Sequence, residues 1–249
     1  MCKYLFKIPL SIDLDNGWSI ASHIKLTGQW IYEGEKVPPH FAEATRGKRD
    51  LVGGELPNKW THVIFNLDKG GTLYYNDIRQ FGWIKIVPTE EVVKLPFVHE
   101  LGPEPPVAKA MEGRGPLTLD VFSKIVSSSN TKIKPLLMDQ KKIGGIGNIY
   151  ANDALFLARI DPRRPAKSLS LSEQSKLYKS IEEVLRRGLK YGGATEMNFV
   201  NVLGQPGGYQ KYFLVYGRES EPCREKCGGK IQKIWLGGRG TYFCPSCQK

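Results

Sequence analysis

Two pairs of cysteines near the C-terminus constrain the fold of this chain more than any other feature of its sequence. The pairs are Cys223-x3-Cys227 and Cys244-x2-Cys247, and sixteen residues separate them. Four thiolates arranged in this way can surround one tetrahedral Zn²⁺, and so short a segment needs the metal to supply its folding free energy. All four positions are cysteine, which leaves no coordination site for water. The sequence therefore predicts one structural zinc ion.

The residues between the two cysteine pairs predict a β-hairpin, with strands in 230–235 and 241–243. Its glycine-rich tip presents Arg239, which could reach a phosphate or a groove, although a solvated arginine gives the same pattern. Two disulfides are the alternative to zinc. They are disfavoured because the members of each pair are close in sequence and because the basic chain suits a reducing compartment.

Basic residues outnumber acidic residues, 36 lysines and arginines to 25 aspartates and glutamates, for a net charge of +11 and a pI of about 9.4. Such a chain is attracted to phosphates, and nucleic acid is its leading partner. The 249 residues leave room for two or three compact units. The sequence contains no apolar run of about 20 residues and no signal peptide. We therefore expect a cytoplasmic protein that does not bind membranes, and nothing demands more than a monomer.

The residue pattern changes along the chain from strand-like to helical and then to a cysteine-bearing segment, which predicts an α+β multidomain protein. Strand-like residues occupy 1–95, with one hairpin at the turn Asp15-Asn16-Gly17, between strands in 4–8 and 18–20, and another joining 61–67 to 72–75. We interpret 32–60, rich in Pro, Gly and charge, as a surface excursion. Prolines mark a linker at 96–116, and helical periodicity follows it.

The clearest helix lies between Ser170 and Tyr191. Ser170 and Glu173 form a capping box at its start. Its apolar face has the spacing of a buried helical stripe and comprises Leu177, Ile181, Val184, Leu185 and Leu189.

Residues 133–151 predict a helix, a glycine-rich turn and a second helix that starts at Asn148. Free N–H groups and the helix dipole favour an anion at such a start. Glycine and asparagine are also ordinary choices at helix ends. Lys134, Lys141 and Lys142 nearby favour a phosphate site over that plainer interpretation.

These blocks together resemble the formamidopyrimidine-DNA glycosylase (Fpg/Nei) family, whose bacterial members excise oxidised purines such as 8-oxoguanine and formamidopyrimidines. The resemblance covers residues 3–5, 23–28, 75–82, 101–105, 133–151, 215–218 and the cysteine-bearing end. It implies a partial β-sandwich (1–95), a linker (96–116), a helix-two-turn-helix DNA-binding domain (117–217) and a C-terminal zinc β-ribbon (218–249).

The resemblance also implies roles for single residues. Lys134, Asn148 and Arg239 would hold phosphates flanking the lesion. Leu26, where the family typically has methionine, Arg79 and Phe81 would fill the gap left by the flipped nucleotide. Without the resemblance, Leu26 and Phe81 would be assigned to the sheet core.

Two loops and the start of the chain complete the comparison with the family. The segment 192–209 resembles the flexible cap over the flipped base. Lys3 falls where the family keeps a lysine that contacts DNA phosphate in the active site. The family's nucleophile is an N-terminal proline followed by glutamate, upstream of that lysine, and neither is present in this sequence. We therefore expect a truncated sequence, since an α-amine with a pKa of about 8 is what attacks the sugar C1′.

The implied function is a bacterial, nucleoid-associated base-excision repair enzyme: a glycosylase for oxidised purines in duplex DNA that also cleaves abasic sites. One alternative is a catalytically inactive protein that binds DNA lesions. Another is a weak lyase that uses Lys3 or the Met1 amine in place of proline, since burial can lower a lysine pKa. A generic zinc-ribbon interaction module would require neither the wedge residues nor the Asn148 site.

Overall fold

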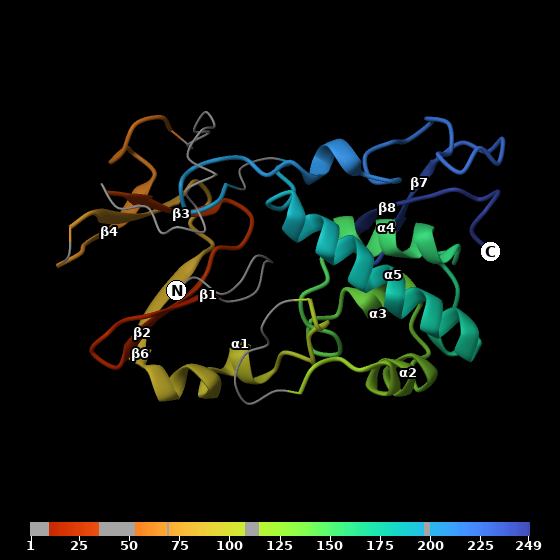
Figure 1. Cartoon of the computed structure of the whole chain (residues 1–249), viewed down its shortest axis with the longest axis horizontal. Coiled ribbons are helices and arrows are strands. Elements are labelled where there is room, and N and C mark those ends of the chain that lie inside the picture. Colours follow the sequence, from red (N-terminus) through yellow and green to blue (C-terminus); the bar gives the residue numbers. More distant parts are fainter. Residues whose placement is uncertain (1–9, 35–52, 69, 108–114, 197–199) are drawn as a thin grey trace. The chain divides into compact units, whose positions relative to one another are not determined.

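The structure, a computed structural model of the chain, describes residues 10–34, 53–68, 70–107, 115–196 and 200–249. Contacts between residues divide the chain into two compact units (Figure 1). The sheet unit comprises residues up to 92 together with 188–211, and the helix–ribbon unit comprises 93–187 and 212–249. In the described part of the chain, no helix has the length and apolar character needed to cross a bilayer.

The sheet unit contains two three-stranded antiparallel sheets, with strand orders β1-β2-β6 and β3-β5-β4. The strands are β1 (Leu10–Asp13), β2 (Trp18–His23), β3 (Gly28–Glu33), β4 (Thr61–Asn66), β5 (Thr72–Asp77) and β6 (Trp83–Pro88), and a 3-10 turn η2 (Thr89–Lys94) follows them. The core of the unit is apolar and aromatic: Ile20, Trp30, Leu73 and Tyr75. A hydrogen bond from Trp30 Nε1 to Ser22 Oγ, 2.9 Å long, joins the two sheets through this core.

Both predicted hairpins are present, with adjusted strands. At the first turn, β1 pairs with β2 from Leu10↔Ser22 to Asp13↔Ser19, while the predicted first strand in 4–8 lies outside the described residues. The second hairpin pairs β4 with β5. The predicted excursion begins too early, because Tyr32 lies in β3, pairs with Leu73 of β5 and packs on the core. The Tyr32 ring packs on the core and so extends β3 through this residue, which the charged residues that follow it in the sequence did not indicate.

The helix–ribbon unit surrounds a helical core and a two-stranded ribbon. Its elements are α1 (Pro96–His99), α2 (Leu119–Ser127), α3 (Ile133–Leu137), α4 (Asn148–Ala158), η3 (Ala166–Ser168), α5 (Leu171–Lys190), η4 (Tyr209–Tyr212), β7 (Gln232–Leu236) and β8 (Arg239–Phe243), of which α5 and η4 cross into the sheet unit. In Figure 1 the strands β7 and β8 lie beside α4, and β8 contacts that helix. The ribbon core shares side chains with the helical part through Phe156, Leu214 and Val215, which pack with Cys223 and Cys244.

The proline-rich segment 96–116 includes a short helix. Pro96 occupies the first turn of α1, where a missing N–H costs nothing. Val98 is buried, and the Gly102 and Gly144 backbones hydrogen bond to Gln140 and Pro103. The part of the predicted linker up to Pro103 therefore packs on the helical part, and the predicted domain boundaries remain predictions.

The capping box of α5 is confirmed. Glu173 Oε2 accepts from the Ser170 N–H at 2.8 Å, and Ser170 Oγ accepts from the Glu173 N–H at 3.3 Å. Arg164 also donates to the Glu173 carboxylate. This ion pair, offset in part by desolvation and helped by Ser170, lowers the pKa of Glu173 to about 2. Of the predicted apolar face, Leu177, Ile181, Val184 and Leu185 are buried.

Replacement of Glu173 by Gln should lower the free energy of unfolding by about 1 kcal/mol at pH 7, because Arg164 and the helix N-terminus lose a negative charge while the Gln amide oxygen can still accept from the Ser170 N–H. The folded-state pKa lies below the ordinary 4.5, so this stabilisation is present above about pH 4.5 and disappears as the pH falls toward 2. Urea unfolding at pH 7 and pH 3 measures both effects. Glu183→Gln is the matched control, since Glu183 makes only an exposed pair with Arg187. Equal losses in the two variants would contradict the stabilising role of the Glu173–Arg164 ion pair.

Candidate metal centre and nucleic-acid interface

The four cysteines of the ribbon converge on one point. Their Sγ atoms all lie within 4.8 Å of one another. Cys223 and Cys247 Sγ are 3.8 Å apart, and Cys227 and Cys244 Sγ are 3.5 Å apart. Tetrahedral zinc with Zn–S bonds of about 2.3 Å requires sulfur separations of roughly 3.8 Å, whereas a disulfide requires about 2.05 Å. The donor set therefore fits one structural Zn²⁺ and not two disulfides.

The wider first knuckle, with three residues between its cysteines, is accommodated by the backbone. Lys226 has φ 53° and Gly228 has φ 74°, so the chain turns back through the left-handed region beside Cys227. The second knuckle is attached to the helical part by Gln248. Its Oε1 accepts from the Cys244 N–H at 2.8 Å, and its Nε2 donates to the Ile160 carbonyl at 2.8 Å.

Three polar side chains from α3 and α4 hold the edge of β8, and we call them with Arg239 the clamp. Lys134 Nζ donates to the Gly240 carbonyl at 3.0 Å and to Thr241 Oγ1 at 2.7 Å. Asn148 Nδ2 donates to the same Gly240 carbonyl at 3.2 Å. The predicted phosphate-binding residues are thus brought together around the residue that follows Arg239.

The third member, Asn152, is a residue that the sequence analysis missed. It is 1 % exposed. Its Oδ1 accepts from the Tyr242 N–H at 2.8 Å, and its Nδ2 donates to the Asn148 carbonyl at 2.7 Å. Its position one helical turn after Asn148 puts both side chains on the same helix face, which is the signal that could have identified it.

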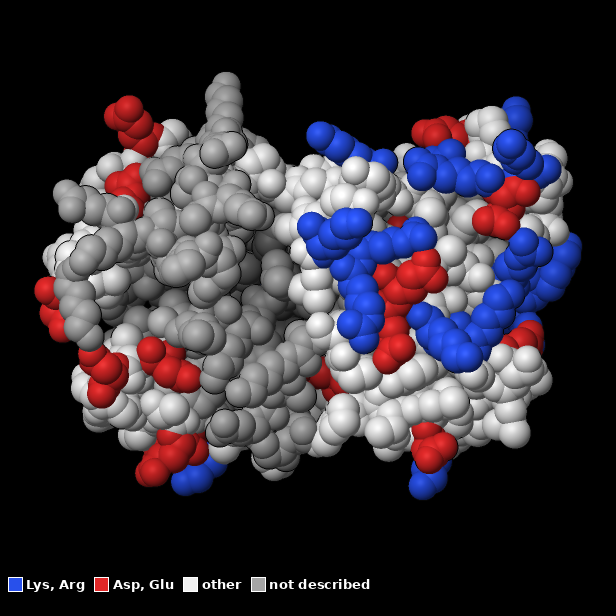
Figure 2. All heavy atoms as spheres, viewed as in Figure 1, with Lys and Arg blue, Asp and Glu red and all other residues white. Residues whose placement is uncertain are grey.

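Lys134 differs from an exposed phosphate ligand in its surroundings. The residue is fully buried, at 0 % exposure. Burial, and secondarily the charge of Arg239, lowers the pKa of Lys134 to about 7. Arg239 itself is exposed at the start of β8. The clamp therefore places a partly charged amine behind an exposed guanidinium. On the face seen in Figure 2, lysine and arginine side chains form patches over the helix–ribbon unit, interrupted by a few acidic ones.

The three predicted wedge residues lie at one end of the β3–β5 pair. Leu26 precedes Gly28, Arg79 follows Asp77, and Gly28 pairs with Asp77. Leu26 is 45 % exposed and Phe81 is 60 % exposed. The Arg79 guanidinium stacks over the Phe81 ring at 4.6 Å from its centroid. Because these side chains face solvent, the alternative that they belong to the sheet core is wrong.

Asp77 organises both wedge loops, and the sequence analysis assigned it no role. Its carboxylate accepts from Thr27 Oγ1, from the Arg79 N–H at 3.2 Å and from the Gly82 N–H at 2.8 Å. The residue is 1 % exposed. Burial raises the pKa of Asp77, but the hydrogen bonds from Thr27, Gly82 and Arg79 outweigh it and hold the pKa below its ordinary 3.8. A fixed carboxylate therefore ties together the loops that carry Leu26, Arg79 and Phe81.

The segment that resembles the cap closes at its base within the sheet unit. The Gly208 N–H donates to Tyr191 O at 2.8 Å, and the Tyr209 N–H donates to Gly193 O at 2.9 Å. A Cβ on Gly207 would lie 2.3 Å from Gly193 O, so this close approach requires glycine. The tip, residues 197–199, and the predicted catalytic Lys3 lie outside the described residues.

Three family models match this chain. The formamidopyrimidine-DNA glycosylase N-terminal domain matches residues 7–84, and the H2TH domain of the same glycosylase matches residues 101–199. A zinc finger found in FPG and IleRS matches residues 220–249. These matches bear out the fold class, with an N-terminal β-sandwich, a helix-two-turn-helix part and a zinc ribbon.

Proteins named formamidopyrimidine-DNA glycosylase are similar over nearly the whole chain. The protein from Pelotomaculum thermopropionicum is 40 % identical over 240 residues, covering 96 % of this chain and 78 % of its own. The protein from Lactiplantibacillus plantarum is 39 % identical over 234 residues, covering 94 % and 76 %. These relatives do not favour the alternative of an inactive lesion-binding protein.

Solved structures with the same fold contain damaged DNA. The Lactococcus lactis Fpg in complex with abasic-site DNA aligns with a TM-score of 0.77 at 30 % identity, covering 98 % of this chain and 79 % of that one. The complex of the same organism's enzyme with DNA that contains Fapy-dG aligns with a TM-score of 0.76 at 29 % identity, with the same coverage.

Proposed function

This chain belongs to the formamidopyrimidine-DNA glycosylase family, and from that premise we propose that it removes oxidised purines from duplex DNA and cleaves the abasic site that results. The observation that carries the proposal is the clamp, in which Lys134, Asn148 and Asn152 fix the strand that presents Arg239. A preorganised guanidinium on a basic surface is suited to a DNA phosphate. The same proposal includes a monomeric protein that acts on the DNA of a bacterial nucleoid.

The clamp and the wedge have complementary tasks in this proposal. Arg239 and Asn148 hold phosphates beside the lesion, and Lys134 supports them from behind through Gly240 and Thr241. Extrusion of the damaged nucleotide leaves a gap in the base stack. Leu26 and Phe81 fill that gap as apolar wedges, and Arg79, held over the Phe81 ring, faces the orphaned base.

The chemical step needs an amine beside the sugar. The family uses an N-terminal proline for this, and in the weak-lyase alternative Lys3 takes its place. A neutral amine attacks C1′, so a C1′–N bond forms while the glycosidic bond breaks and the base leaves with a proton. The nitrogen lone pair then opens the sugar ring and gives a protonated Schiff base. Transfer of a C2′ proton to water expels the phosphate on the 3′ side and cuts the strand, and hydrolysis of the Schiff base frees the amine. Added borohydride reduces the Schiff base and leaves a stable covalent complex.

Replacement of Lys3 by Ala should remove the borohydride-trapped complex on abasic-site DNA while binding falls by less than about tenfold, the loss of one phosphate contact. Denaturing electrophoresis measures trapping, and fluorescence anisotropy measures binding. The same gel on 8-oxoguanine and formamidopyrimidine duplexes reports base release and strand scission. Lys85→Ala, at an exposed lysine on β6 of the same unit, is the control. Full trapping by the Lys3 variant would transfer the role to another amine, and no product from the unsubstituted chain would contradict the proposed activity.

DNA affinity should decrease as the pH rises from about 7 to 9, and Lys134 should account for the decrease. Burial is the larger cause, and the positive charge of Arg239 the smaller cause, of the lowered pKa of Lys134, about 7. A phosphate held by Arg239 offsets the second of these. DNA binding therefore raises the pKa of Lys134 and takes up a proton. The resulting gain in DNA affinity is complete below pH 7 and is lost as the pH rises through the raised pKa of the complex. The change is at most tenfold per pH unit. Dissociation constants of the unsubstituted chain and of Lys134→Met at pH 6, 7, 8 and 9 measure it, and equal slopes would contradict the assignment.

A further inference from the structure

An exposed tryptophan stands on the outer face of the ribbon, outside the clamp. Trp235 in β7 is 72 % exposed, more than any other aromatic side chain in the described residues. Single exposed apolar side chains are common on folded proteins. A large exposed aromatic side chain among basic residues, however, is typical of a binding surface.

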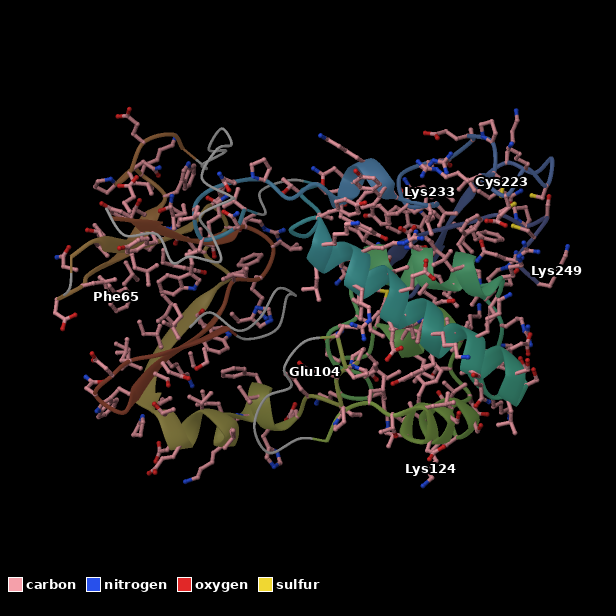
Figure 3. The ribbon with its side chains drawn as sticks, viewed as in Figure 1. Phe65, Glu104, Lys124, Cys223, Lys233 and Lys249 are labelled. Atoms are coloured by element: carbon pink, nitrogen blue, oxygen red, sulfur yellow. The ribbon has the colours of Figure 1, made fainter. Side chains whose placement is uncertain are left out.

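Strand register places Trp235 in a stripe with a lysine and a second aromatic ring. Lys233 is opposite Tyr242, and Trp235 is opposite Gly240. Lys233 Nζ lies 5.8 Å from the Trp235 ring centroid and 5.5 Å from the Tyr242 ring centroid. In Figure 3 Lys233 is labelled on the helix–ribbon unit, with Cys223 and the sulfur atoms to its right. The lysine therefore stands between two rings on one face.

The opposite face of the hairpin is occupied by the protein itself. Thr241 and Phe243 are both fully buried, and β8 contacts α4. Because side chains alternate along a strand, Trp235, Lys233 and Tyr242 belong to the other face. On that face Tyr242 is half-buried against Tyr216 and the ribbon core, whereas Trp235 and Lys233 are exposed. A Cβ on Gly240 would lie 3.7 Å from Lys233 Cε and 3.7 Å from Tyr242 Cε2, so these two side chains cover the strand opposite Trp235.

The charge of the ribbon identifies the chemistry of the partner. From Arg218 to Lys249 there are three acidic residues, Glu219, Glu221 and Glu225, and seven basic ones: Arg218, Arg224, Lys226, Lys230, Lys233, Arg239 and Lys249. Glu219 lies 3.9 Å from Lys233 Nζ, and the ribbon keeps an excess of positive charge. Aromatic rings with interleaved cations form platforms for nucleotides, because the ring packs on a base or sugar while the cation meets the phosphate. An apolar protein partner would not require this excess of positive charge.

The stripe adjoins the clamp through the Gly240 backbone, whereas strand alternation puts the Arg239 side chain on the opposite face of the hairpin. Gly240 lies opposite Trp235 and next to Arg239, and its carbonyl accepts from Lys134 and Asn148. We propose that Trp235, Lys233 and Tyr242 form an accessory contact for DNA that continues past the phosphate held by Arg239, with the Trp235 ring packed against a nucleotide. This inference rests on the proposed function, and it extends the DNA footprint onto a second face of the ribbon.

The test measures affinity for duplexes that carry an abasic-site analogue and are lengthened one base pair at a time on each side. Trp235→Ala should weaken binding to the longest duplex about 5- to 20-fold, within the range for loss of one nucleotide–aromatic contact, and should have no effect on the shortest duplexes. Trp235→Phe should restore most of the affinity. Trp18→Ala, which removes a 45 % exposed tryptophan from the sheet unit, is the matched control and should leave affinity unchanged.

Tryptophan fluorescence gives a second readout of the same contact. The fluorescence of Trp235 is the difference between the emission of the unsubstituted chain and that of Trp235→Phe, and duplex DNA should quench it. The fluorescence of Trp18, obtained in the same way, should not be quenched. Zinc content and circular dichroism of the variants establish that the ribbon stays folded.

Equal affinities of Trp235→Ala and the unsubstituted chain at every length would overturn the inference and leave the proposed function intact. Conversely, an unsubstituted chain that binds damaged and undamaged duplexes equally, with a Trp235 effect on both, would contradict the proposed function alone. Absence of DNA binding at every length would overturn both.

Discussion

Removal of zinc is expected to unfold the ribbon and to weaken DNA binding at least 100-fold. Structural zinc sites of four cysteines contribute about 10–16 kcal/mol of apparent binding free energy, comparable to the whole stability of a domain. Cys223 and Cys244 also pack against Phe156, Leu214 and Val215. Loss of the metal therefore removes the core of the ribbon, the strand that Lys134 and Asn148 hold, and the position of Arg239.

Cys244→Ala tests this expectation without a chelator, since Cys244 is one of the four clustered cysteines and is fully buried. Metal analysis should find one zinc ion per chain in the unsubstituted protein and none in the variant. Cys2→Ala, at a cysteine that belongs to neither pair, is the control and should keep both zinc and affinity. Zinc-free protein that binds DNA as tightly as the zinc-loaded form would contradict the structural role of the metal.

Replacement of Asp77 by Ala should lower the free energy of unfolding by about 3–5 kcal/mol and remove the preference for damaged DNA. The change leaves the donors of Thr27, Arg79 and Gly82 without their shared acceptor, and a buried unpaired donor costs about 1–3 kcal/mol. The loops that carry Leu26 and Phe81 then lose the shared carboxylate that holds them together. We expect nonspecific DNA affinity to persist, because the clamp belongs to the other unit.

Denaturant unfolding, together with affinities for abasic-site and undamaged duplexes, measures both parts of this expectation. The contribution of Asp77 is present above its ordinary pKa of 3.8 and is lost as the pH falls below that value, because its folded-state pKa is lowered. Asp68→Ala, at an exposed turn of the same unit, serves as the control. A destabilised Asp77 variant that still prefers damaged DNA would separate the fold of these loops from lesion recognition.

Local patterns in the sequence were sufficient wherever the structure depends on neighbouring residues. Cysteine spacing identified the metal ligands, Ser170 and Glu173 identified a helix start, and two glycine-bearing turns identified hairpins. Each of these features is determined within a few residues of itself. The chemistry of such signals does not depend on where distant parts of the chain lie.

Features that depend on distant contacts could not be predicted in this way. Lys134 looks like a surface cation in the sequence, yet its amine is buried against residues more than 100 positions away, Gly240 and Thr241. Asp77 gains its role from Thr27, 50 residues earlier. Residues 188–211 group with the sheets although a helix leads into them. Partners of this kind are created by the fold, so only the three-dimensional arrangement identifies them.

The measurement that tests the central claim most directly is the affinity of this chain for a duplex with one abasic-site analogue, compared with the same duplex undamaged, across a salt series. The clamp should give both duplexes a similar salt dependence, since phosphate contacts do not depend on the lesion. The wedge should add a preference of about tenfold or more for the abasic-site duplex at every salt concentration, since a nucleotide without its base costs less to unstack. Equal affinities for the two duplexes throughout the series would contradict the account of this chain as a protein that recognises damaged DNA.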